Sequence, residues 1–292
     1  MSDASLLSLI KQRRLGLLAT YSLTAVENAL DVLFPWAIGV AINGVLAGDV
    51  SSVSWLVGLW SADITFGTLR RRYDTRLFES LFVTFASTFA ASQRAANAST
   101  SETAARVEMS RDVIGFFETQ IPEALELTVL LLGGVALLYT YDSVSGTAAL
   151  AATVFGVLLS TWYGRRVMPL HENMHDQYEG EVDALEDDDD TAPPTHFQRL
   201  ASWQIRLSDN EAANWAVLDI VSLGVVLVVL FRLAALPGAE AGTIFAALAY
   251  ALRVGHGLGR LPPLAQELGQ LQDMWSRLQE EEAGDSEPNA PE

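Results

Sequence analysis

Three residues of this 292-residue sequence have the spacing of a zinc-binding motif. His171, Glu172 and His175 spell H-E-x-x-H. On a helix this spacing places two imidazoles on one face as ligands, with a glutamate beside them as general base. Polar neighbours occupy positions where zinc proteases usually have apolar residues, and no third ligand has persuasive spacing, although Glu179 and the acids of 186–190 follow. A protease site, an incidental metal site and a solvated helix face all stay open.

Acids inside apolar stretches form a second group of candidate residues. Glu27 and Asp31 stand four residues apart, with Asn28 beside them, and so share one helix face. Asp63 and Asp219 lie in other apolar stretches. Ionisable groups are costly in lipid and usually mark a cavity or pathway. Glu27, Asn28, Asp31 and Asp63 are therefore predicted to line a translocation cavity that favours cations or exchanges protons. The alternative is that they pair with polar groups of neighbouring helices.

Long apolar helices are needed to position these residues. A spanning helix takes about 20 predominantly apolar residues. Three runs are long and strongly apolar: residues 124–141, 147–163 and 216–236. Three further segments are less apolar: residues 15–42, 53–69 and 241–255. Weak hydropathy is expected where a helix lines water or a partner subunit. The sequence thus predicts an all-α polytopic membrane protein with six transmembrane helices.

The positions of the basic residues predict the orientation of these helices. Lys and Arg concentrate in four segments: residues 11–14, 70–111, 165–206 and 253–277. The short connections at 43–52 and 142–146 contain neither. Under the positive-inside rule the basic segments face the cytoplasm. Both termini are therefore expected in the cytoplasm, with the protein in the inner (cytoplasmic) cell membrane.

The two inner connections, residues 70–120 and 164–213, are too long for turns and keep a helical pattern. Five apolar residues recur there at intervals of three and four: Leu77, Leu81, Phe82, Phe85 and Phe89. The membrane helices are therefore expected to continue into the cytoplasm. Pro193 and Pro194 should divide the second connection into two arms.

Composition sets further limits. Half of the residues are hydrophobic, and the mean hydropathy is +0.24, as expected for spans combined with polar extensions. The net charge is −18, so a basic nucleic-acid footprint is absent. We divide the chain into an amphipathic elbow helix at 1–14, a transmembrane domain at 15–280 and a disordered acidic tail at 281–292. There is no cysteine, which excludes a disulfide framework.

Several short motifs occur in a characteristic order. Residues 34–36 read Phe-Pro-Trp and residues 41–44 read Ala-Ile-Asn-Gly, an apolar helix with a proline and a polar outer ending. The tip helix at 70–89 is followed by Ser-Glu-Thr-Ala-Ala-Arg at 101–106, and Leu-Pro-Pro-Leu at 261–264 follows the last span. This order resembles the transmembrane domain of an ABC exporter with the type IV fold, in a six-helix form without an attached ATP-binding domain.

The resemblance implies a docking role for the tips of the inner connections. In this family such tips are coupling helices that contact an ATPase, here at about residues 86–96 and 195–206. The residues expected to make these contacts are Phe89, Gln93, Arg94, His196, Phe197 and Arg199. The single lysine, Lys11, has no glycine-rich turn before it, so these residues contain no P-loop. The chain is therefore not expected to be an enzyme on its own or to hold a cofactor. ATP and Mg²⁺ would be bound by a partner subunit.

Dimerisation follows from the polar faces of three spans, which six helices alone would turn toward lipid. We expect a homodimer or heterodimer with another six-helix half, moving an unknown substrate by alternating access. One alternative is an ATP-independent, ion-coupled carrier or channel. A zinc-dependent membrane protease through His171, Glu172 and His175 is another, and a structural or assembly role also stays open.

Overall fold

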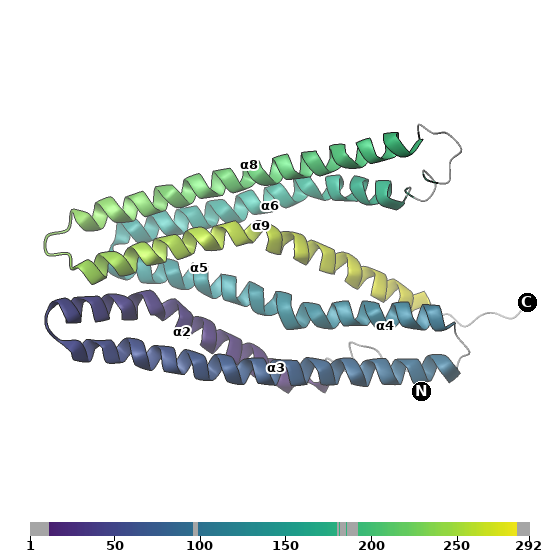
Figure 1. Ribbon diagram of the computed structural model, residues 1–292, viewed down its shortest axis with the longest axis horizontal. Coiled ribbons are helices and arrows are strands. Elements are labelled where there is room, and N and C mark those ends of the chain that lie inside the picture. The colour runs from purple at the N-terminus through teal and green to yellow at the C-terminus, as the bar shows by residue number, and fades with distance from the viewer. Residues whose placement is uncertain (1–11, 96–98, 180, 182–184, 186–191, 285–292) are drawn as a thin grey trace, which may run out of the picture. The chain divides into compact units, whose positions relative to one another are not determined.

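Long helices make up the described part of the chain. The computed structural model describes residues 12–95, 99–179, 181, 185 and 192–284. Within these ranges the elements are helical, without β-strands (Figure 1). The longer helices are α2 (Arg14–Leu46), α3 (Val53–Ala95), α4 (Thr100–Gly115), α5 (Ile121–Tyr141), α6 (Ser143–Glu179), α8 (Ala192–Ala234) and α9 (Ala241–Gly284). A short 3-10 turn, η1 (Val50–Ser52), precedes α3, and a π-helical turn, η2 (Phe116–Gln120), joins α4 to α5. The predicted all-α fold is confirmed.

Four of the helical segments are long and apolar enough to cross a membrane. They are Arg14–Leu46, Arg111–Tyr141, Ser143–His171 and Pro193–Ala234. These segments include the expected spans at 15–42, 124–141 and 147–163 and most of the span at 216–236. The two remaining expected spans, 53–69 and 241–255, are helical within α3 and α9 but fall outside this set of apolar segments. They are the segments whose hydropathy was already low in the sequence.

Several helices are longer than a membrane requires. Helices α3 and α8 have 43 residues each, and α6 has 37. At about 1.5 Å per residue, α3 is about 64 Å long. The predicted helical extensions are therefore confirmed. Pro193 and Pro194 lie in the first turn of α8, where a missing backbone N–H breaks no helical hydrogen bond.

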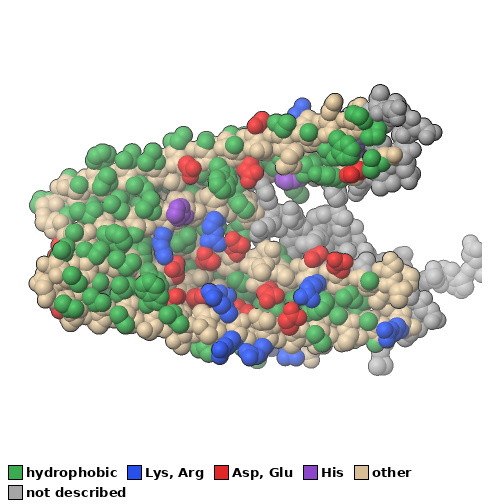
Figure 2. Space-filling view, in the orientation of Figure 1, with side chains coloured by type: hydrophobic (Ala, Val, Ile, Leu, Met, Phe, Trp, Pro, Cys, Tyr) green, Lys and Arg blue, Asp and Glu red, His purple; other side chains and the backbone are tan. Residues whose placement is uncertain are grey.

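The chain forms two compact units. Unit 1 contains Met1–Gly134, Gly238–Ala247 and Glu267–Glu292, and unit 2 contains Val135–Pro237 and Leu248–Gln266. In unit 1, α2 and α3 form an antiparallel hairpin; in unit 2, α6 and α8 do the same (Figure 1). Along the α2–α3 hairpin, hydrophobic side chains gather near the closed end and charged ones toward the open end (Figure 2). This distribution is the one expected for a hairpin that leaves the bilayer at its open end.

A hydrophobic core in unit 1 holds the open end of the α2–α3 hairpin to α4. It contains Leu17 of α2, Leu77, Phe78, Leu81 and Phe85 of α3, and Val113 and Ile114 of α4. Phe82 and Phe89 pack against it. The helical face predicted from the spacing of Leu77, Leu81, Phe82, Phe85 and Phe89 is therefore confirmed. In unit 2, a smaller core of Tyr163, Val167 and Leu207 joins α6 to α8.

The motif Ala-Ile-Asn-Gly at 41–44 contacts the start of α9 at the closed end of the α2–α3 hairpin. The side-chain oxygen of Asn43 accepts a 2.7 Å hydrogen bond from the backbone N–H of Gly242, in the first turn of α9. A Cβ atom on Gly39 would lie 2.5 Å from the Gly242 carbonyl oxygen, so the two backbones touch directly. Gly44 likewise leaves room for Ser52 at the start of α3. The motif therefore provides a cap for one helix and close contact with two.

Some sequence predictions fall partly outside the described residues. Most of the expected elbow helix at 1–14 and the acidic run at 186–190 lie outside them. Helix α9 continues to Gly284, so the first residues of the expected acidic tail are helical, and the rest of that tail lies outside the described residues.

Candidate functional site

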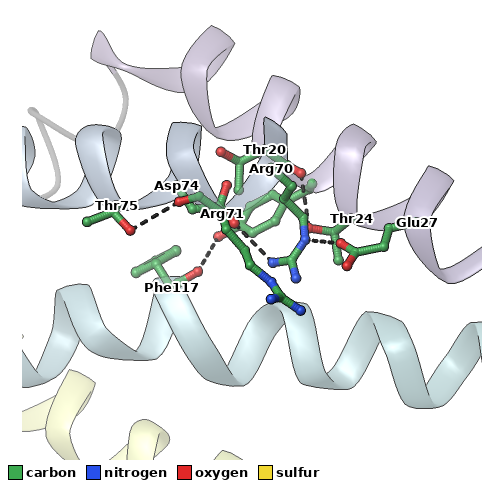
Figure 3. Close-up of polar contacts among 9 residues, drawn as sticks. Thr20, Thr24, Glu27, Arg70, Arg71, Asp74, Thr75 and Phe117 are labelled. Atoms are coloured by element: carbon green, nitrogen blue, oxygen red, sulfur yellow. Dashed lines mark hydrogen bonds and ion pairs between the residues drawn. The ribbon is translucent and has the colours of Figure 1, made fainter. Parts of the chain in front are cut away.

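A polar cluster lies between α2 and α3 in unit 1. Its centre is Arg70 of α3, whose guanidinium forms an ion pair with Glu27 of α2 and a second, at 3.0 Å, with Asp74 of α3 (Figure 3). Only 20 % of the Arg70 side chain and 17 % of the Glu27 side chain are exposed. One guanidinium is therefore paired with two carboxylates, and these three residues together carry one net negative charge.

The local sequence of α3 explains how the cluster forms. Arg70 and Asp74 are four residues apart and thus neighbours on one helix face. Gly67 precedes Arg70 by about one turn, and a Cβ atom there would lie 2.8 Å from a carboxylate oxygen of Glu27. The glycine thus gives Glu27 the space to reach Arg70 across the helix interface.

Asp74 has an unusual electrostatic environment. Burial raises its pKa, although the neighbouring Thr20 hydroxyl and the ion pair with Arg70 oppose the shift. The side chain is only 9 % exposed. Because desolvation disfavours the charged form, Asp74 gains a proton more readily than an exposed aspartate.

A second contact of this region ties α2 to the π-helical turn. The Tyr21 hydroxyl donates a 3.0 Å hydrogen bond to the carbonyl oxygen of Phe117. In η2 the N–H of Ile121 donates to the carbonyl of Phe116, five residues earlier. The next bond of this pattern would join residue 122 to Phe117, but Pro122 has no N–H. Tyr21 therefore supplies the donor that the proline lacks.

The four predicted cavity residues lie along the α2–α3 hairpin. Glu27 is paired with Arg70, and Asn28, Asp31 and Asp63 are half-buried. Asp63 is within electrostatic range of Glu27 and Asp31 and also of the Arg71 guanidinium. The amide nitrogen of Asn28 is buried and has no hydrogen-bond partner among the described residues. Asp219, on α8 in unit 2, is exposed and belongs to no such group.

The predicted coupling residues fall into two sets. On α3, Phe89 stacks on Phe85 with ring centroids 5.5 Å apart, Gln93 is half-buried and Arg94 is exposed.

On α8, Phe197 and Arg199 are exposed, whereas His196 is only 5 % exposed. The Nδ1 atom of His196 lies 2.8 Å from the amide nitrogen of Gln177 on α6. His196 therefore joins α6 to α8, and Phe197 and Arg199 present the surface at this end of the hairpin.

The H-E-x-x-H motif lies in the inner part of α6. His171 is half-buried, while the side chains of Glu172 and His175 lie outside the described residues. Among the described residues, no group of three or more His, Cys, Asp or Glu is arranged to hold a metal ion. The motif therefore stays a prediction.

Sequence reasoning missed the two residues that define the polar cluster on α3. Arg70 was interpreted only as one of several positive charges marking the cytoplasmic side, and Asp74 was not considered. The pattern Gly67, Arg70, Asp74 on one helix face, opposite an acid on the preceding helix, was the available signal.

The fold and the distribution of charge define an integral membrane protein with long helical extensions. A family model described as ABC transporter transmembrane region matches residues 6–242. The chain belongs to this family. Its fold is therefore that of an ABC-transporter transmembrane region, and the protein is a membrane transporter subunit. No curated protein matches the sequence.

Proposed function

We propose that the chain is one membrane-spanning half of a dimeric transporter. The dimer moves its substrate by alternating access, and a separate subunit hydrolyses ATP. The observation that carries this proposal is the family membership over residues 6–242, combined with helices that extend far beyond the membrane.

The end of the α6–α8 hairpin at which α6 leads into α8 supports an ATPase-docking role. Phe197 and Arg199 are exposed on α8, and His196 beneath them is fixed by Gln177. A rigid helix end that presents an aromatic ring and a guanidinium has the composition of a protein interface. The docking partner is the ATPase subunit, with ATP and Mg²⁺ bound there.

Copurification from native membranes tests this proposal. The intact chain should bring down an ATPase whose turnover it stimulates. Arg199→Glu should weaken that association about tenfold, because it reverses a charge at the contact. The matched control is Arg166→Glu, an exposed arginine of α6 that stacks on Trp162 and lies outside both predicted coupling segments. Copurification of no ATPase, or equal effects of the two variants, contradicts the proposal.

A second candidate function, ion-coupled transport, is favoured by one observation. Asp63 lies near Glu27 and Asp31, while the cluster's arginine, Arg70, already pairs with Glu27 and Asp74. Carboxylates grouped in this way can exchange protons or bind cations. Because Glu27 is needed to neutralise Arg70, Asp63→Asn is the cleaner test. It should abolish proton-coupled flux in liposomes and leave the fold intact, and unchanged flux would exclude this candidate.

A further inference from the structure

Helix α9 contains two consecutive prolines inside its helical span, Pro262 and Pro263. A proline has no N–H, so the carbonyl four residues earlier loses its helical partner. The carbonyls of Leu258 and Gly259 are therefore freed together. Inside a membrane domain, freed carbonyls are tolerated where neighbouring side chains or ordered water satisfy them.

Three helices of unit 2 meet next to these prolines. A Cβ atom on Gly156 of α6 would lie 2.7 Å from a methyl group of Leu258 on α9 and 3.6 Å from one of Leu218 on α8. Gly255 of α9 similarly faces Ser222 of α8, at 2.9 Å from its Cβ atom. The absence of a side chain at Gly156 thus brings α6, α8 and α9 together at one level.

One helical turn further along each helix, this contact continues with polar side chains. Helix α8 runs antiparallel to α6 and α9. One turn beyond Gly156, Leu258 and Leu218, in the same direction along the bundle, are therefore Ser160 of α6, Pro262 of α9 and Asn214 of α8. Ser160 is 3 % exposed and Asn214 is 5 % exposed, and Pro262 is also buried. The serine, the asparagine and the proline therefore lie together at the junction of the three helices.

The polar atoms at this junction are not satisfied by the protein. Neither the amide nitrogen nor the amide oxygen of Asn214 has a hydrogen-bond partner among the described residues, and the same holds for the Ser160 hydroxyl. A buried amide and hydroxyl without partners are strongly destabilising. Two donor groups thus lie beside a helix that carries two freed acceptors.

We propose that Ser160 and Asn214 form a water-binding site that hydrates the Leu258 carbonyl, which is freed by the buried Pro262. The ligand is one or more ordered water molecules, which donate to this carbonyl. The waters donate to the Asn214 oxygen and accept from its NH₂ group and from the Ser160 hydroxyl. Each of these buried polar groups then has a partner, as native interiors require.

A double-mutant cycle in full-length protein in nanodiscs tests the proposal. Asn214→Leu keeps the size of the side chain and removes its polar atoms. In the protein with its natural prolines, Asn214→Leu should lower the midpoint of thermal unfolding by about 3 °C, because the bridging water loses its hydrogen bonds to Asn214. With Pro262→Ala and Pro263→Ala present, α9 regains its N–H donors, and Asn214→Leu should leave the midpoint unchanged or raise it.

Asn210→Leu is the matched control. Asn210 lies one turn away on the same helix and donates a 2.7 Å hydrogen bond to the carbonyl of Arg206, so its effect should be equal in both backgrounds. The proposal is overturned if Asn214→Leu is stabilising in the natural background, or if its effect does not depend on the prolines.

Radiolytic labelling gives a second readout on unmodified protein. Hydroxyl radicals formed from bound water oxidise adjacent side chains, so Leu258 should be labelled despite being fully buried. Labelling at Leu258 should fall severalfold in Asn214→Leu. Absence of labelling at Leu258 in the natural protein would show that the junction is dry and would refute the water site.

Discussion

Each unit contains a helix interrupted by proline, and the two units deal with the interruption differently. In unit 1, Pro122 deprives the Phe117 carbonyl of a donor, and Tyr21 supplies one directly at 3.0 Å. In unit 2, Pro262 frees a carbonyl beside Ser160 and Asn214, whose polar atoms stay unpaired within the described part of the protein. A direct side-chain bond therefore serves the carbonyl freed in unit 1, whereas the proposed water site would serve the one freed in unit 2.

Unit 1 is also held together by other direct contacts between its helices. Arg70 joins Glu27 and Asp74, and Asn43 caps α9 across the outer end. Gly39 and Gly242 bring two backbones into contact. Open positions occur in both units: a Cβ atom on Gly164 or Gly224 of unit 2, or on Gly58 of unit 1, would meet nothing within 4 Å. Direct contacts hold the helices in a single geometry, whereas loosely packed or hydrated contacts can rearrange. A transporter requires such rearrangement in some part of its membrane domain.

The largest expected effect is at Arg70. Arg70→Ala leaves Glu27 and Asp74 close together and largely buried without a cation, which should destabilise the protein by about 3 kcal/mol. Thermal unfolding in detergent measures this loss. Arg71→Ala, at the exposed neighbouring arginine, should change stability by less than about 0.5 kcal/mol. Similar effects of the two variants would show that the ion pairs do not hold unit 1 together.

Glycine substitutions compare packing in the two units. Gly242→Ala would place its Cβ atom against the Gly39 carbonyl and 2.6 Å from the Asn43 side-chain oxygen, and should cost about 2 kcal/mol. Gly224→Ala in α8 meets open space and should be neutral or stabilising by about 0.5–1 kcal/mol, because alanine favours helix. Chemical denaturation of both variants measures the contrast. A neutral Gly242→Ala would mean that the outer end is not closely packed.

Removing the Tyr21 hydroxyl tests the direct bond beside Pro122. Tyr21→Phe should destabilise unit 1 by about 1 kcal/mol, because the Phe117 carbonyl loses its donor. Pro122→Ala restores a backbone N–H and should reduce that loss. Tyr73→Phe on α3 is the control, because Tyr73 is exposed and its hydroxyl makes no hydrogen bond within the described residues, so its removal should leave stability unchanged. If Tyr21→Phe lowers stability equally in the natural protein and in Pro122→Ala, the Tyr21 hydrogen bond does not compensate for the missing N–H of Pro122.

The smallest expected effect concerns Asp142, between α5 and α6. It caps α6 by accepting from the backbone N–H of Ser145 at 2.8 Å, and Arg232 donates to it at 2.9 Å. The Arg232 hydrogen bond, together with those from Ser145, lowers the pKa of Asp142 to about 2. Asp142→Ala should cost about 1 kcal/mol near neutral pH.

The same pKa predicts a pH dependence. The folded value is below the unfolded one, so the stabilisation is present above about pH 4 and is lost as pH falls toward about 2. The stability difference between wild type and Asp142→Ala should therefore shrink over that range. A difference that stays constant with pH would exclude the charged carboxylate as its source.

The parts of the fold that depend on local pattern were predictable from sequence. The apolar spacing from Leu77 to Phe89 predicted a buried helix face. Three strongly apolar runs and one of the less apolar segments, 15–42, predicted spans that match the apolar helices of the structure. The less apolar segments at 53–69 and 241–255 were harder, because hydropathy falls where a helix faces polar surroundings.

The contacts that define the polar cluster depend on distant residues and were not predictable. Glu27 and Arg70 are separated by 43 positions, and Tyr21 and Phe117 by 96. Periodicity assigned Glu27 to a helix face but could not show that Arg70 lies opposite it. Asn214 and Ser160 were overlooked for the same reason, since their significance depends on prolines in a third helix.

Distance measurements between protomers test the central claim most directly. The sequence contains no cysteine, so Gln198→Cys on the exposed end of α8 provides a unique spin-label site. The same label at Arg72→Cys, an exposed position of α3 outside both predicted coupling segments, avoids the docking surface. In the purified homodimeric complex with its ATPase, double electron–electron resonance should give one distance between protomers, and ATP with vanadate should shift it by several ångströms, as alternating access requires. A missing dipolar signal, or a distance unchanged by nucleotide, would contradict a dimeric, ATP-driven transporter.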